Sequence, residues 1–170
     1  MDDIKTIYNP IKVDDDYFAF HENEQNELYA KMKTISETII DILFGQNTPK
    51  IIMNICQNYQ LNYKQSEELS RLIRKILVAE IYLGDIISEI AGRLQIGENI
   101  ARELANKLIA DLFANALEDI KKLHREKFGA SITGQVATSK IPIPPLDPPV
   151  TQHQEEKEKM NPNNVLDLRK

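Results

Sequence analysis

The residue types that most often carry catalysis or bind metals are scarce in this sequence, and their spacing matches no common site. Cys56 is the only cysteine. Its counterpart in an internal repeat, described below, is Ala91, so we interpret Cys56 as a small packing residue. His21, His124 and His153 form neither a His-x-x-x-His nor a Glu-x-x-His pattern, which argues against a zinc or di-iron site on a helix. We therefore predict no catalytic residue, no metal and no cofactor, and we do not expect an enzyme.

Acidic residues are concentrated near the start of the chain. Residues 1–23 hold six acids and two lysines, a net charge of −4, whereas the whole chain has a formal net charge of −5. The acidic run 14–16 lacks the glycine and the final glutamate of a calcium-binding loop, so we interpret it as a solvated stretch. Because the remainder is almost neutral, it lacks the positive charge that phosphate binding needs, and we do not expect nucleic acid as a partner.

Basic side chains occur in two predicted helices, and we interpret both groups as solvated. One group surrounds His124 near a helix end, where positive charge and a partly cationic imidazole suit the helix dipole. The other is spread over the outer faces of its helix and is too sparse for a binding patch. The members are Lys121, Lys122, Arg125 and Lys127 in the first group and Arg71, Arg74 and Lys75 in the second.

The sequence carries no sign of a membrane or of an oxidising compartment. One cysteine forms no intramolecular disulfide, and no stretch approaches ~18 consecutive apolar residues. The N-terminus lacks the basic and apolar regions of a signal peptide. We therefore expect a cytoplasmic protein that does not contact a membrane.

The periodicity of apolar residues predicts five helices, and no useful stretch alternates with the period of two that a strand requires. Gly45 stops the first helix, and Thr48 followed by Pro49 starts the second as N-cap and first helical residue. Asn62, with Gln65 three residues on, predicts a capping box at the start of the third. The predicted helices cover about 24–44, 49–60, 63–82, 85–94 and 98–128, and Gly129 ends the last of them.

An offset of 35 residues relates the second and third helices to the fourth and fifth. Repeats of this kind mark stacked units that bury their apolar faces against one another. We predict an all-α fold, a compact bundle or short stack of five helices in the order long, short, long, short, long, built on a 35-residue helical-hairpin repeat. The expected inward residues are Ile35, Ile39, Leu43, Ile52, Ile55, Leu69, Ile73, Leu77, Ile87, Ile90, Leu104, Leu108, Leu112 and Phe113.

Two segments flank the predicted helical domain, which covers 24–129. The acidic N-terminal arm, 1–23, either docks on its own domain, binds a partner or is unstructured. The C-terminal segment, 130–170, is rich in proline, and we predict a disordered tail that either keeps the protein soluble or carries a partner-binding peptide. The candidate partner-binding residues are Tyr17, Phe18 and Phe20 in the arm and Val165, Leu166 and Leu168 in the tail.

The stretch 89–101 resembles the first helix, the turn and the start of the second helix of bacterial helix-turn-helix proteins. In that family the second helix enters the major groove of DNA, and polar residues near its start contact the bases. The resemblance implies that Asn99, Arg102 and Asn106 would contact DNA. A weaker copy of the same pattern recurs at 54–65.

We favour a non-enzymatic interaction or adaptor protein, in which the helical body holds an unidentified protein partner and the proline-rich tail extends as a tether. The alternative is a helix-turn-helix transcription regulator that uses residues 89–106. The end of the fifth helix continues past the repeat and carries Ile120, Leu123 and Phe128. This apolar overhang would pair with the first helix or with a second copy in a homodimer.

Overall fold

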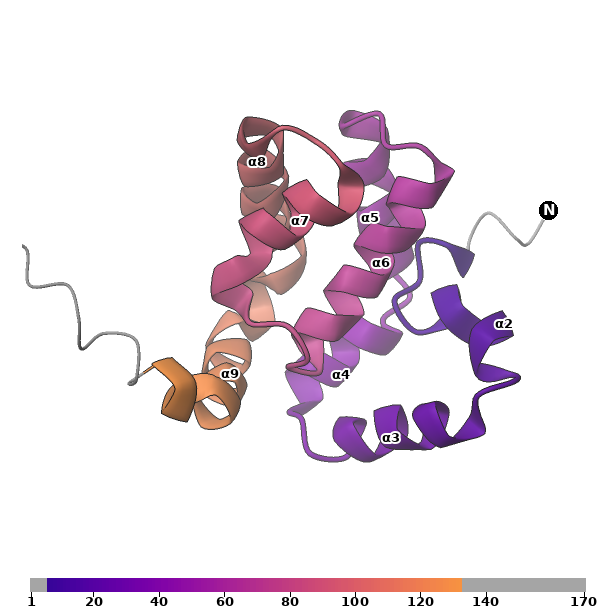
Figure 1. Ribbon diagram of the computed structural model, residues 1–170, viewed down its shortest axis with the longest axis vertical. Helices are drawn as coiled ribbons and strands as arrows, with labels where there is room; N and C mark the ends of the chain where they lie inside the picture. The colour runs from indigo at the N-terminus through magenta and orange to yellow at the C-terminus, as the bar shows by residue number, and fades with distance from the viewer. Residues whose placement is uncertain (1–5, 133–170) are drawn as a thin grey trace, which may run out of the picture. The chain divides into compact units, whose positions relative to one another are not determined.

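The computed structural model describes residues 6–132, with the backbone alone described at 130–132. Within this range the regular structure is helical throughout, with seven α-helices of eight residues or more and no strand (Figure 1). The prediction of an all-α fold is therefore confirmed, whereas the five-helix count is not. No helix in the described range is long and apolar enough to cross a membrane.

The helix predicted over 24–44 is wrong, because the chain breaks it in two. A 3-10 turn (η1, Lys12–Asp14) and a short helix (α2, Asp15–Phe18) precede α3 (Glu22–Met32) and α4 (Glu37–Phe44). The break lies where the Thr34 hydroxyl donates to the Lys31 carbonyl oxygen at 2.7 Å and Ser36 takes up an extended backbone as N-cap of α4. Hydroxyl side chains that bond nearby backbone groups compete with helix continuation and can end a helix. The apolar periodicity continues across this break, so the periodicity alone did not reveal it.

The next helical pair starts close to its predicted positions, although the third helix ends at Leu77 rather than near Tyr82. Helix α5 covers Thr48–Asn58 and α6 covers Tyr63–Leu77. Asn62 and Gln65 form the expected capping box, each side chain accepting the other's backbone N–H at 2.9 Å. Thr48 is the first helical residue rather than the N-cap, because its hydroxyl donates to the Ile42 carbonyl oxygen at 2.7 Å and ties α5 to the end of α4.

Left-handed residues at Gln60, Ala79 and Gln95 follow three of the helices, and the first and last of these lie at matching places in the two predicted hairpins. Helix α7 (Ile86–Leu94) is joined to α8 (Glu98–Leu108) through Gln95 at a φ of 54°, and α5 is joined to α6 through Gln60 at 52°. In each turn the next N–H reaches back five residues to a helical carbonyl, from Leu61 at 2.9 Å and from Ile96 at 3.2 Å. These bonds are of the type that closes a helix through a left-handed residue, so both pairs are bent by the same local mechanism.

The helix predicted over 98–128 is also wrong as a single element. Helix α8 passes into a π-helical turn (η3, Ile109–Phe113) and a 3-10 turn (η4, Ala114–Ala116) before α9 (Leu117–Ile132). The apolar positions from Leu104 to Ile120 recur every four residues, and each such step overshoots one α-helical turn by about 40°. A wider π turn returns these side chains to the core. Gly129 does not end the helix, which continues to Ile132.

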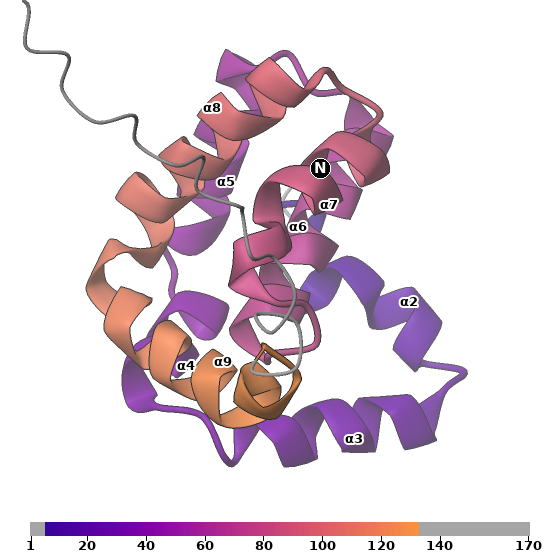
Figure 2. The ribbon, with the colours of Figure 1, turned by 60° about the vertical axis from the view of Figure 1, so that its left-hand side comes forward.

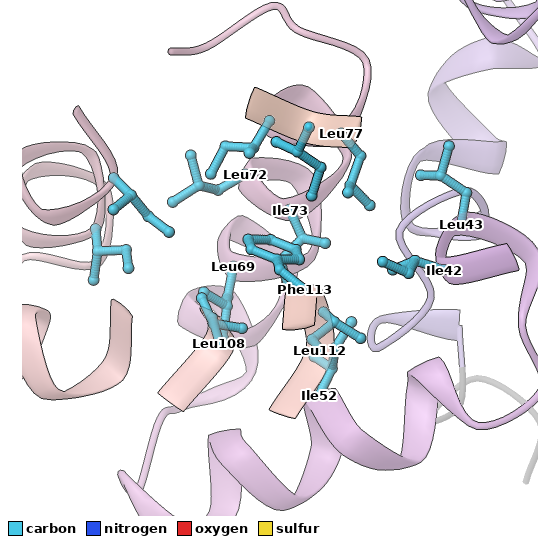
Figure 3. Packing of buried hydrophobic residues seen from close by; sticks show 14 of the residues in the cluster. Ile42, Leu43, Ile52, Leu69, Leu72, Ile73, Leu77, Leu108, Leu112 and Phe113 are labelled. Carbon is cyan, nitrogen blue, oxygen red and sulfur yellow. The ribbon is translucent and has the colours of Figure 1, made fainter. Parts of the chain in front are cut away.

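The core lies between α4, α5, α6 and the continuous helical segment from α8 to α9. All predicted inward residues are buried except Ile35 and Ile87, which are partly buried and pack against the same cluster. In Figure 3 the Phe113 ring lies close to Leu69 and Ile73 of α6, with Leu108 and Leu112 beside it. The helical stripes thus identified most of the core.

A buried histidine joins α9 to the end of α6. His124 accepts the Leu83 N–H at Nδ1 (2.9 Å), and its Nε2 lies 2.7 Å from the Ile76 carbonyl oxygen, to which it donates. The expected cationic role at a helix end is wrong for this side chain, because burial lowers the pKa of His124 below 6.5. Ile120 is buried and Phe128 packs edge-on to His124, so the apolar overhang is used within the chain.

Candidate functional site

The N-terminal arm, which the structure describes from residue 6, docks on α6. Ile7 and Pro10 are buried, and the Ser70 hydroxyl of α6 donates to the Ile7 carbonyl oxygen at 2.5 Å. The Asn9 side-chain oxygen accepts the N–H groups of Ile11 (3.0 Å) and Lys12 (3.1 Å), which turns the chain back towards α6. Of the three alternatives for the arm, the geometry of these residues corresponds to docking on its own domain.

Asp14 is the main polar anchor of the arm. Its Oδ1 accepts Arg71 Nε at 2.6 Å, and its Oδ2 accepts Arg74 Nη2 at 2.7 Å. Arg71 also donates to Glu68 at 2.8 Å. Burial alone would raise the pKa of Asp14, but the hydrogen bond from Arg71 and the charge of Arg74 outweigh burial and lower the pKa below 3.8. The interpretation of 14–16 as a solvated run is therefore wrong for Asp14 and right for its two exposed neighbours.

The aromatic residues of the arm divide between the core and the surface. Phe18 is buried in the core cluster, with the Arg74 guanidinium carbon 5.3 Å from its ring centroid. Tyr17 is 45% exposed and stacks on His21 with ring centroids 3.9 Å apart. Phe20 is 87% exposed. We call residues 17–21 the aromatic turn, because backbone bonds from Phe20 to Tyr17 (3.1 Å) and from His21 to Phe18 (3.1 Å) close it.

A cleft of about 430 Å³ lies between the arm, α3 and α6, and we call it the arm cleft. Figures 1 and 2 both show α3 on the side of the described residues away from α8. At one edge of the cleft Lys31 of α3 donates to Glu80 at 2.7 Å. At another, the Tyr17 hydroxyl donates to Glu24, with distances of 2.8 and 2.9 Å to its two oxygens, and this bond raises the pKa of Tyr17. One ion pair and one tyrosine–carboxylate hydrogen bond therefore lie at the cleft edges.

The remaining predicted contact residues lie elsewhere or outside the described range. Asn99, Arg102 and Asn106 are exposed on α8, where Arg102 donates to Glu98 at 2.8 Å. Val165, Leu166 and Leu168 of the predicted tail lie outside the residues that the structure describes. Tyr17 and Phe18 pack edge-on with ring centroids 5.7 Å apart, Phe20 lies on the same turn but points into solvent, and the α8 residues lie on a different helix.

Reactive side chains within the described residues are held in structural contacts. Burial raises the pKa of the Cys56 thiol, as expected for a packing residue. His124 is buried between backbone partners. No three His, Cys, Asp or Glu side chains gather in residues 6–132 as a metal site would require.

Sequence analysis missed the two arginines that anchor the arm. Arg71 and Arg74 were expected on outer helix faces, but Arg74 is buried and lies beneath the arm. Their spacing of three residues places both on one side of α6, where a single carboxylate reaches them. The signal available in the sequence was this pair together with an acidic run among aromatic residues, but 57 or more residues separate the partners.

The chain was compared with protein-family models, with curated proteins and with solved structures, and none of the three comparisons finds a match.

Proposed function

We propose that this protein is a non-enzymatic protein-binding module, an adaptor whose contact surface centres on the aromatic turn. One observation carries the proposal: Phe20 is 87% exposed on a turn whose neighbours Asp14 and Phe18 are fixed against α6. A large apolar side chain that is held out into solvent gains about 1.5–3 kcal/mol when a partner buries it. Because the turn is already ordered, binding costs less conformational entropy there than in a flexible peptide.

The side chains around Phe20 suit a protein partner. Tyr17 and His21 form a flat stacked pair beside it, and aromatic rings of this kind are frequent anchors in protein interfaces. The aromatic turn also carries the exposed end of Tyr17, whose hydroxyl is fixed by Glu24. A partner with an apolar pocket for Phe20 would meet a polar rim at these residues.

The helical body in this proposal is a duplicated hairpin, α5–α6 followed by α7–α8. The sequence offset of 35 residues supports the duplication, and left-handed turns occur at the matching positions Gln60 and Gln95, with a third of the same geometry at Ala79. The matching backbone bonds from Leu61 to Cys56 and from Ile96 to Ala91 support it as well. Such a body provides a rigid base on which the arm is mounted.

A photo-crosslinking experiment tests the proposal. A photoreactive phenylalanine analogue replaces Phe20 in one full-length protein and Phe44, which is 53% exposed on α4, in a matched control. Both are irradiated in nuclease-treated native cell extract. We expect a discrete protein adduct at position 20 that unlabelled wild-type protein competes away and the Phe20→Ser variant does not. Absence of such an adduct, or an equal and non-competed background at both positions, would contradict the proposal.

DNA binding by α8 is the second candidate, and the exposed polar side chains of α8 support it. Helix α8 presents exposed Asn99 and Arg102 near its start, where a recognition helix carries its base-contacting residues, and exposed Asn106 further along. Against it, Arg102 is paired with Glu98, and Lys107 is paired with Asp111 at 2.8 Å. A reversal of charge at Arg102 that leaves the affinity for every DNA tested unchanged would exclude this candidate.

A further inference from the structure

The arm cleft has the size of a small-molecule site and a lining rich in charge. Its volume of about 430 Å³ lies in the range of ligand pockets. Most charged groups of the lining are already paired: Asp14 with the two arginines, and Lys31 with Glu80. The groups that are left without partners therefore indicate what the cleft can bind.

Two of the unpaired groups are donors on α6. Arg74 uses Nη2 on Asp14, while its Nη1 is buried and meets no acceptor, in a side chain that is only 7% exposed. A buried donor without an acceptor is costly, so an oxygen atom that accepts from this nitrogen would be bound favourably. Lys75, the next residue, also lines the cleft, and its side-chain ammonium group makes no hydrogen bond or ion pair within the described residues.

We propose that the arm cleft binds a small molecule through one oxyanion group, a carboxylate or a phosphate, which accepts from Arg74 Nη1 and pairs with Lys75. Because Asp14 already accepts from Nη2 of the Arg74 guanidinium, a ligand receives one hydrogen bond from this arginine rather than a fork of two. The ligand replaces the missing acceptor and adds its charge next to a free ammonium group.

The lining also limits the charge of the ligand. Glu27 of α3 is an exposed carboxylate of the same cleft without a partner within the described residues. A carboxylate repels a multiply charged anion, so a single oxyanion group on a small molecule suits the cleft better than a polyphosphate or a long acidic peptide. Removal of the Glu27 charge and removal of the Lys75 charge should therefore change anion affinity in opposite directions.

Binding in the arm cleft would stabilise the arm. Tyr17 and Phe18 line the cleft and belong to the aromatic turn, so a ligand that bridges them to α6 favours the docked arm over a detached one. This inference does not depend on protein binding at Phe20, because either site can exist without the other.

The test uses the full chain, labelled with ¹⁵N and titrated with sodium phosphate, with sodium acetate, and with sodium chloride at matched ionic strength. We expect saturable shifts in the Arg74 side chain and in the amides of residues 71–75 with phosphate, with acetate or with both, and none with chloride. The phosphate and acetate arms distinguish the two ligand sources. Lys75→Gln should weaken binding about tenfold, and Glu27→Gln should tighten it about twofold.

The matched control is Lys64→Gln, an exposed lysine on the same helix that does not line the cleft. Its affinity should equal that of the wild-type protein. These three variants alter partly or fully exposed side chains outside the core, so folding is preserved and can be verified in the same spectra. No saturable shift with either anion, or equal affinities for Lys75→Gln and Lys64→Gln, would overturn the proposal.

Discussion

Replacing Asp14 by alanine should destabilise the protein far more than replacing a neighbouring acid. Asp14 accepts hydrogen bonds from two arginines, and hydrogen bonds to charged groups contribute about 1.5–3 kcal/mol each. Arg71 would keep its ion pair with Glu68 and is partly exposed, so the free-energy cost of losing its bond to Asp14 is small. Arg74 is left as a buried charge without a partner, and breaking a buried pair costs about 3–5 kcal/mol. We expect a loss of about 3 kcal/mol, at the low end because the arm can admit water.

The assay is equilibrium urea unfolding followed by circular dichroism, with Asp16→Ala as the control. Asp16 is exposed and lies two residues after Asp14, so its replacement should change the free energy of unfolding by less than about 0.5 kcal/mol. The double variant Asp14→Ala, Arg74→Met should be more stable than Asp14→Ala alone, because it removes the orphaned charge. Equal effects of Asp14→Ala and Asp16→Ala, or a further loss in the double variant, would refute the reasoning.

Two further predictions concern the body. Burial lowers the pKa of His124 below 6.5, so as the pH falls the unfolded chain takes up this proton before the folded protein does. The free energy of unfolding should therefore fall as the pH drops below 6.5 and level off at the pKa of the folded protein. Urea titrations should show a shallower pH dependence in His124→Gln. An added Cβ at Gly45 would collide with the Asp41 carbonyl oxygen, so Gly45→Ala should cost about 2 kcal/mol in thermal unfolding, whereas Gly92→Ala, in open space on α7, should stabilise by up to about 1 kcal/mol. An unchanged slope in His124→Gln, or the same sign for both glycine variants, would contradict these expectations.

Local signals in the sequence predicted the start of α6 and most of the core. Asn62 and Gln65 act through bonds within four residues, so their pattern is sufficient to place the start of α6. Apolar spacing identified Leu69, Ile73 and Leu77 for a similar reason, because a helical period determines which side chains share a face.

The breaks in the two long predicted helices, and the pairing that forms the candidate site, could not be predicted from such local patterns. The break before Ser36 depends on a competition between side-chain and backbone bonds, and the π turn at 109–113 relieves a mismatch of phase that appears only when α8 and α9 pack on one core. The site depends on Asp14 meeting Arg74, a pairing 60 residues apart that no periodicity encodes.

Amide hydrogen exchange of the arm tests most directly the claim that the aromatic turn is a fixed part of the fold. The N–H groups of Val13 and Ala19 donate to the Asn9 and Asp15 carbonyl oxygens at 3.0 Å, and that of His21 donates to Phe18. We predict that these amides exchange at least about tenfold more slowly than in an unfolded chain, and that Asp14→Ala removes the protection while Asp16→Ala does not. Exchange at the unfolded rate in the wild-type protein would contradict the account.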